Sequence, residues 1–199
     1  MSALLAARDD GRLARWLAPL GRALPPSGLA LLAVAEPLLL LLRSDAKPSH
    51  GLIAAAVVWL VVLGGASRGG DLARDRFAWL VPGLLRAGEY ALLLWISSAG
   101  CSEGPAAGFA LVVVLAFHHY DLVYRPRHQG AEPPAWLGLV AGGWDGRLIL
   151  AWILLAADAL PAGLYVLAGA LGILFVGESI ASWRGHGPLP LPDPEGDAG

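Results

Sequence analysis

Three polar side chains interrupt a long apolar run between residues 77 and 98. Arg86, Glu89 and Tyr90 are spaced by three and four positions, so a helix would place them on one face. Ionisable side chains are costly inside a membrane-spanning helix and therefore indicate a functional site. The alternative is that Arg86 and Glu89 form a pair within their own helix that holds the bundle together.

The next apolar run ends in the densest polar sequence of the chain, residues 118 to 125. At about 100° per residue, His118, Asp121 and Arg125 fall within about 60° of each other, whereas His119 points elsewhere. Two imidazoles, a carboxylate and a guanidinium could bind a phosphate group. The alternative is a solvated helix end with an aromatic belt, to which Tyr124 would belong.

Residues 142 to 147 open a further run with the sequence Gly-Gly-Trp-Asp-Gly-Arg. In the simpler interpretation, Asp145 caps its own helix. In the other, the glycines and free N–H groups of a helix start attract an anion, and Arg147 binds phosphate with two hydrogen bonds. Glu178 lies near the end of the last apolar run.

These positions predict a polar cavity open to one side of a helix bundle, suited to a phosphate-bearing lipid or a nucleotide-activated substrate. The candidate ligand-binding residues are Arg86, Glu89, Tyr90, His118, His119, Asp121, Tyr124, Arg125, Asp145, Arg147 and Glu178. Carboxylate oxygens are the ligands that Mg²⁺ and Mn²⁺ prefer. The candidate metal ligands are Glu89, Asp121, Asp145 and Glu178.

Apolar helices must position these side chains. The predicted spans are 28–43, 51–66, 77–98, 105–124, 144–159 and 161–184. The first two are short for a bilayer core of about 30 Å, so a hairpin that enters only partly is the alternative for that pair. The prediction is an all-α polytopic membrane bundle of about six transmembrane helices, in a domain from residue 27 to 184.

Flanking segments complete the predicted organisation. Residues 1–26 are expected to form an amphipathic helix in the membrane interface, because Leu13, Trp16 and Leu20 recur at the helical period opposite several arginines. Asp9, Asp10 and Gly11 precede that helix and could cap it. Residues 185–199 are rich in Pro, Gly and acids and predict a disordered tail.

The composition supports a membrane protein. Apolar residues make up 56% and charged residues 15% of the 199, against roughly 25% charged in a soluble domain. The net charge of −2 gives no indication of nucleic-acid binding. With six spans, ten arginines lie on the side of both termini and only Arg43 and Lys47 on the other, which predicts that both termini are cytoplasmic at the plasma membrane.

The chain also resembles a known group of proteins. Arg8-Asp9-Asp10-Gly11, Phe77 to Tyr90, Phe117 to Arg125 and Gly142 to Arg147 are similar to an actinobacterial integral membrane domain of unknown function. That domain commonly follows a CDP-alcohol phosphotransferase domain, so the resemblance implies such an enzyme as a partner. It assigns no catalytic residues.

The chain does not carry the phosphotransferase signature itself. That motif, D-G-x2-A-R-x8-G-x3-D-x3-D, would begin at Asp145-Gly146, but Ile149 and Leu150 stand where Ala and Arg are required. A P-loop, a G-x-S-x-G motif and an H-E-x-x-H motif are also absent from the sequence. The sequence therefore favours an accessory or partner module in phospholipid or glycolipid-precursor synthesis. The alternatives are an independent membrane transferase acting on lipid phosphates or a small transporter.

Overall fold

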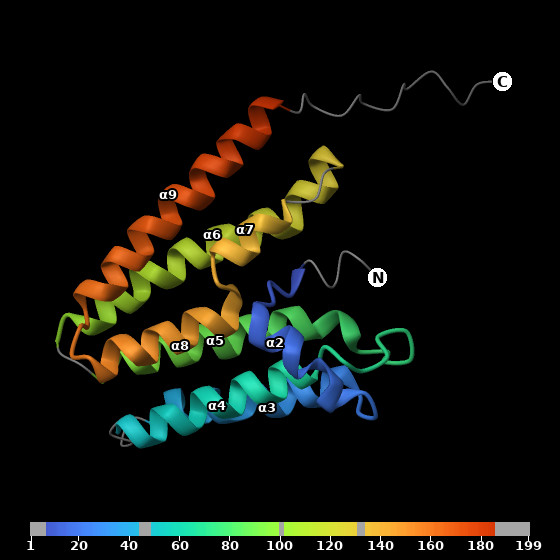
Figure 1. The fold of residues 1–199 in the computed structure, drawn as a ribbon, viewed down its shortest axis with the longest axis horizontal. Coiled ribbons are helices and arrows are strands. Elements are labelled where there is room, and N and C mark those ends of the chain that lie inside the picture. Colours follow the sequence, from blue (N-terminus) through green and yellow to red (C-terminus); the bar gives the residue numbers. More distant parts are fainter. Residues whose placement is uncertain (1–6, 44–48, 100–101, 131–133, 186–199) are drawn as a thin grey trace.

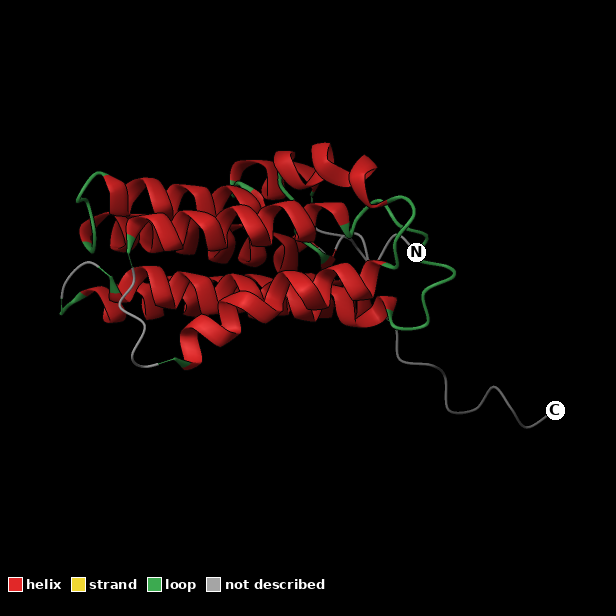
Figure 2. Cartoon of the chain, turned by 90° about the horizontal axis from the view of Figure 1, so that it is seen from below, coloured by secondary structure: helices red, strands yellow, loops and turns green. Residues whose placement is uncertain are grey.

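The computed structural model describes residues 7–43, 49–99, 102–130 and 134–185, and this part of the chain consists of helices joined by turns and loops, with no strand. The α-helices are α2 (Arg12–Leu17), α3 (Pro26–Leu42), α4 (His50–Ala66), α5 (Val81–Ser98), α6 (Gly104–Gln129), α7 (Ala135–Val140), α8 (Gly143–Ala156) and α9 (Ala162–Gly185). The helices α3, α4, α5 and α8 run along the long direction of the molecule, whereas α6 and α9 run obliquely to it (Figure 1), and the loops lie at the ends of the bundle (Figure 2). Two 3₁₀ turns, η1 (Ala18–Gly21) and η2 (Ala78–Leu80), precede α3 and α5.

Two groups of helices make up the bundle. In the first, α5 packs against α3, and α8 lies over α5 and α4. In the second, α6 packs along α9, and α5 joins the two groups through its contacts with α6 (Figure 1). The short helix α2 lies against the end of α4 and the start of α8.

Six of these helices agree closely with the six apolar runs of the sequence. Three bounds differ. The helix α5 begins at Val81 rather than at residue 77, and α6 continues through Pro126 to Gln129, beyond the predicted end at residue 124. The helix α8 ends at Ala156 rather than at residue 159. The segments Ala78–Ser98, Gly104–Arg127, Trp136–Ala156 and Ala162–Gly185 are long and apolar enough to cross a membrane. The helices α3 and α4 are apolar but shorter, with 17 residues each.

The outer surface of the bundle is apolar. Large side chains such as Leu42, Val166 and Ile173 are 71% to 79% exposed. A water-soluble protein of this size rarely exposes such side chains along whole helices. The described structure is therefore that of a membrane protein.

The start of α3 is fixed by a distant carboxylate. Pro26 occupies the first helical position, where a missing N–H costs nothing. Asp75 accepts hydrogen bonds from Ser27 N at 2.6 Å, Ser27 Oγ at 2.9 Å and Phe77 N at 3.0 Å. Burial alone raises the pKa of Asp75, but these hydrogen bonds lower it below its ordinary value.

The N-terminal segment differs from the single helix predicted over residues 1–26. Its helical part is α2 followed by η1, and Arg8, Asp9 and Asp10 before it are buried in the bundle. The predicted apolar face is turned outward, because Trp16 and Leu20 are 76% and 65% exposed, and its position in the membrane interface stays a prediction. Residues 1–6 and the predicted tail after residue 185 lie outside the described residues.

Candidate functional site

The segment Arg8 to Gly11 is buried at one end of the bundle, next to the end of α4 and the start of α8. Arg8, Asp9 and Asp10 are only 2%, 8% and 6% exposed. Buried charges are tolerated only when they are paired and hydrogen-bonded. The partners of this segment therefore show how the site is built.

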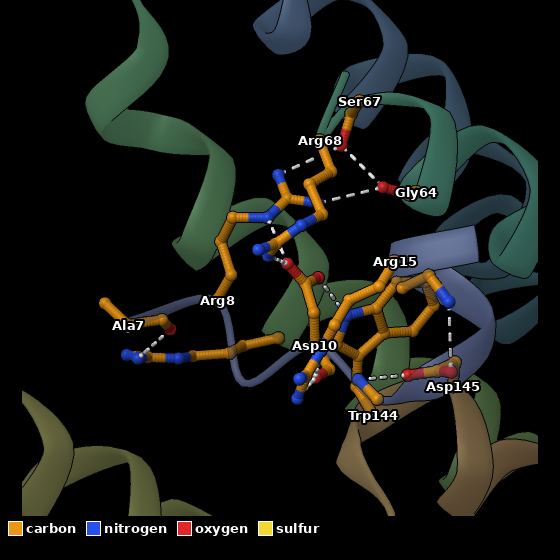
Figure 3. Close-up of polar contacts among 12 residues, drawn as sticks. Ala7, Arg8, Asp10, Arg15, Gly64, Ser67, Arg68, Trp144 and Asp145 are labelled. Carbon is orange, nitrogen blue, oxygen red and sulfur yellow. Dashed lines mark hydrogen bonds and ion pairs between the residues drawn. The ribbon is translucent and has the colours of Figure 1, made fainter. Parts of the chain in front are cut away.

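Asp10 anchors the segment to two helices (Figure 3). Its carboxylate accepts hydrogen bonds from Arg8 Nε at 2.8 Å and Arg68 Nη1 at 2.5 Å. The indole Nε1 of Trp144 donates to the same carboxylate at 2.9 Å. Arg8 also donates to the carbonyl oxygen of Gly64 at 3.0 Å, which satisfies a carbonyl near the end of α4.

Asp145 caps α2 rather than its own helix. Its carboxylate accepts from the backbone N–H groups of Gly11 at 2.6 Å, Leu13 at 3.0 Å and Ala14 at 3.2 Å. Gly142 is the N-cap residue of α8, and it makes no side-chain cap. The expectation that Asp145 caps α8 is therefore wrong. Of the three residues expected to cap the N-terminal helix, Gly11 is the N-cap of α2, whereas Asp9 and Asp10 do not cap it because both carboxylates turn into the bundle.

Two glycines allow this close contact between α8 and the N-terminal segment. A Cβ atom on Gly11 would clash with Asp145, and one on Gly143 would clash with the backbone of Gly11. Gly143 also has a φ of +64°, which L side chains rarely adopt. The segment can therefore lie directly on the start of α8.

Asp9 lies beside charged side chains of the helices α5 and α8. Its carboxylate accepts a hydrogen bond from Arg147 Nη2 at 2.8 Å, and Arg147 Nε donates to Glu89 Oε1 at 2.7 Å. Glu89 and Arg147 are 0% and 1% exposed. The predicted pair between Arg86 and Glu89 is replaced, because Glu89 binds Arg147 and Arg86 Nη2 donates to the carbonyl oxygen of Ala7 at 2.7 Å.

Both adjacent histidines also face Asp9. His118 Nε2 lies 3.7 Å from Asp9 Oδ1, and His119 Nε2 lies 3.5 Å from Asp9 Oδ2. His119 Nδ1 is hydrogen-bonded to the hydroxyl of Tyr90 at 2.6 Å. The ring of His118 stacks on Phe175 of α9 with a centroid separation of 3.9 Å. The imidazoles are therefore held by α5 and α9 on either side of Asp9.

We refer to these residues together as the Asp9 cluster. Its members are Asp9, Arg86, Glu89, Tyr90, His118, His119 and Arg147. Burial alone raises the pKa of Asp9, but the charge of Arg147 and the two imidazoles hold that pKa well below its ordinary value. Among the described residues, Arg147 Nη1, His118 Nε2, His119 Nε2 and Glu89 Oε2 have no hydrogen-bond partner.

A second set of charges, the Arg125 cluster, joins α6 to α9. Arg125 donates two hydrogen bonds to Glu178, from Nη1 at 2.7 Å and from Nη2 at 2.6 Å. Its Nη2 also contacts Asp121, one helical turn earlier, and Ser179 Oγ donates to Asp121 at 3.3 Å. Such a bidentate arrangement fixes the position of one helix against another.

Comparison with known proteins gives one match. The profile described as "Family of unknown function (DUF5941)" matches residues 1–198 of the 199-residue chain. The chain belongs to DUF5941. No curated protein and no solved structure matches it. Membership agrees with the predicted resemblance to a family of unknown function, whereas the actinobacterial origin and the link to a CDP-alcohol phosphotransferase stay predictions.

The structure of this DUF5941 member divides the residues that the sequence grouped together. Arg86, Glu89, Tyr90, His118, His119 and Arg147 belong to the Asp9 cluster. Asp121, Arg125 and Glu178 form the Arg125 cluster, and Asp145 caps α2. Tyr124 stacks on Tyr120 and is 38% exposed.

The four carboxylates predicted to hold Mg²⁺ or Mn²⁺ do not come together. Glu89 is paired with Arg147, Asp145 with backbone N–H groups, and Asp121 and Glu178 with Arg125. Within the described residues, no group of three His, Cys, Asp or Glu side chains could hold a metal ion. The sequence placed Asp121, Asp145 and Glu178 near one end of their helices and Glu89 deeper, but it could not show that each already has a cationic or N–H partner.

In this family member the predicted polar cavity is largely filled by the chain's own N-terminal segment. Sequence reasoning did not include Arg8, Asp9, Asp10 and Arg68 in the site, although Arg8 to Gly11 was one of the segments that carried the resemblance. A pocket of about 190 Å³ does open between α2, α7 and α8, next to Asp145. Its lining includes Gly138, Leu139 and Gly146 and none of the Asp9 cluster.

Proposed function

We propose that this protein is an accessory membrane module in phospholipid or glycolipid-precursor synthesis that holds a phosphate-bearing ligand at the Asp9 cluster. In this proposal the chain crosses the plasma membrane six times, with both termini in the cytoplasm. The module works beside an enzyme such as a CDP-alcohol phosphotransferase, which supplies or consumes the ligand.

One observation carries the proposal. Arg147, His118 and His119 converge on a single carboxylate, and each keeps a buried nitrogen without a hydrogen-bond partner in the described structure. Buried donors that remain unpaired are costly in a purely structural network. Donors of this kind are the groups that proteins use to bind phosphate oxygens.

The place of the cluster supports the same conclusion. The neighbouring residue Asp10 binds Arg68 just after α4, where the loop arginines Arg74 and Arg76 follow. Basic loops are typical of the cytoplasmic side, where nucleotide-activated lipid precursors are available. Arg86 and Tyr90 are only partly buried, so the cluster reaches the surface of the bundle along α5.

The experiment is ligand-induced thermal stabilisation of the purified protein in detergent. CDP-diacylglycerol, polyprenyl phosphates and nucleotide sugars are each tested with and without Mg²⁺, beside diacylglycerol and polyprenol, which carry no phosphate. We expect a phosphate-bearing compound to raise the melting temperature, and the double variant His118→Gln/His119→Gln to lose most of that shift.

The matched control is Arg184→Gln, which removes one exposed positive charge near the end of α9 and should keep the full shift. Equal shifts with the phosphate-free lipids would contradict the proposal. An unchanged shift in the double histidine variant would place the ligand elsewhere and would also contradict it.

A specific observation favours a second candidate, an independent transferase. Asp9, His119 and Tyr90 form a chain in which the carboxylate faces Nε2 and the hydroxyl is bonded to Nδ1. Such a chain can move a proton, as general acid–base catalysis requires. Turnover of a lipid phosphate by the isolated protein, lost in Tyr90→Phe, would support this function over the accessory role.

A further inference from the structure

The Asp9 carboxylate makes contacts of unequal length with the basic side chains that surround it. Its one side-chain hydrogen bond from an arginine is that of Arg147, at 2.8 Å. The two imidazole nitrogens lie 3.5 and 3.7 Å away, which is longer than a hydrogen bond of normal strength. Asp9 therefore makes a hydrogen bond of normal length with only one of the three basic side chains that face it.

The segment is held in place by the residues next to Asp9. Asp10 is anchored by Arg8, Arg68 and Trp144, and Gly11 N by Asp145. The carbonyl oxygen of Asp9 also accepts from Trp144 N at 3.2 Å. The side chain of Asp9 could thus rotate away while the backbone of the segment remains in position.

The backbone at Asp9 is itself unusual. Its φ is +51°, in the left-handed region that non-glycine residues seldom occupy. Strained conformations of this kind persist where the surrounding structure imposes them and are common at ligand sites. Here the conformation directs a carboxylate at three basic side chains, and the low pKa of Asp9 keeps that carboxylate charged.

We propose that Arg147, His118 and His119 form a phosphate subsite that Asp9 occupies as an internal substitute, and that the phosphate group of the ligand displaces the Asp9 side chain. A tetrahedral phosphate offers more acceptor oxygens than a carboxylate and would give both imidazoles and the free nitrogen of Arg147 a partner. The inference rests on the proposed function and adds to it a competition between Asp9 and the ligand.

The test compares wild type with Asp9→Asn, which keeps the shape of the side chain and removes its charge. Inorganic phosphate and a short-chain phosphatidic acid are titrated separately by calorimetry in detergent, with the matching diacylglycerol as a blank. We expect Asp9→Asn to bind phosphate about tenfold or more tightly than wild type, because a competing charge-assisted hydrogen bond is removed. Asp75→Asn, which removes a carboxylate outside the cluster, should bind as wild type does.

The two probes separate the sources of the phosphate group. If Asp9→Asn binds both probes more tightly than wild type, the subsite recognises the phosphate group alone. If the affinity rises for phosphatidic acid only, the subsite recognises a lipid headgroup. Either result supports the inference.

A measurement on wild type keeps the inference testable if Asp9→Asn fails to fold. Carbodiimide labelling of carboxylates is read by mass spectrometry. Labelling should increase at Asp9 when the short-chain phosphatidic acid is added and should not change at Asp145. Equal binding by wild type and Asp9→Asn, weaker binding by the variant, or unchanged labelling of Asp9 would each overturn the inference while leaving the proposed function standing. Failure of both probes to bind either protein would overturn the proposed function as well.

Discussion

Replacement of Asp145 by alanine tests most directly whether its carboxylate caps the start of α2. In the structure this one carboxylate accepts three backbone N–H groups at the start of α2, at 2.6 to 3.2 Å. Leu13 is partly exposed, so water can satisfy its N–H after the change, whereas Gly11 and Ala14 are buried. Each buried donor left unpaired costs about 1–3 kcal/mol. We therefore expect Asp145→Ala to lower the free energy of unfolding by about 4 kcal/mol.

The assay combines denaturant unfolding in detergent with hydrogen exchange of the amides from Gly11 to Ala14. Both stability and local protection should fall in Asp145→Ala. Glu103→Ala is the matched control, because Glu103 is an exposed N-cap residue of α6 that makes no side-chain cap. Wild-type stability together with unchanged protection of these amides would refute the reasoning.

The remaining predictions concern other parts of the bundle. A double-mutant cycle of Arg125→Ala and Glu178→Ala should give a coupling energy of about 1–3 kcal/mol in denaturant unfolding, and a value near zero would contradict the observed ion pair. Gly143→Ala should destabilise the protein by roughly 2 kcal/mol or more, because a positive φ and a clash both oppose the new Cβ, whereas Gly146→Ala, which meets open space, should be neutral or slightly stabilising. Asp75 has a lowered folded-state pKa, so its contribution is complete above the unfolded value of about 3.9 and is lost as the pH falls through the folded value. The stability difference between wild type and Asp75→Asn should therefore shrink below about pH 4, and a difference that grows there would contradict the assignment.

Much of the helical architecture follows from the sequence, because long apolar runs bounded by Pro and Gly predict helices and their ends. The bounds of α3, α4 and α9 agree with those runs to within about two residues, and α5 begins four residues after the predicted start, behind the 3₁₀ turn η2. Two differences involve proline. The helix α6 continues through Pro126, beyond the predicted end at residue 124, because a hydrogen bond lost near a helix end costs little, and the short α7 follows Pro134 outside the six predicted runs.

The site could be predicted only in part. The spacing of Arg86, Glu89 and Tyr90 and the paired histidines indicated polar residues inside the bundle, of which Glu89, His118 and His119 are buried and Arg86 and Tyr90 are partly buried. Their partners could not be inferred, because Asp9 and Arg147 are 138 positions apart and no local pattern brings them together. Asp9 and Asp10 at the start of a helix are common as exposed caps, and only the folded chain shows that they neutralise a buried basic cluster.

The central claim is that the Asp9 cluster binds a phosphate-bearing ligand. The most direct measurement is native mass spectrometry of the protein released from membranes in detergent, with bound lipids identified by fragmentation. We predict one phosphate-bearing lipid or precursor retained per wild-type chain, and its loss in His118→Gln/His119→Gln but not in Arg184→Gln. Retention of the same lipid at the same ratio in all three proteins, or the absence of any phosphate-bearing ligand from wild type, would contradict the account.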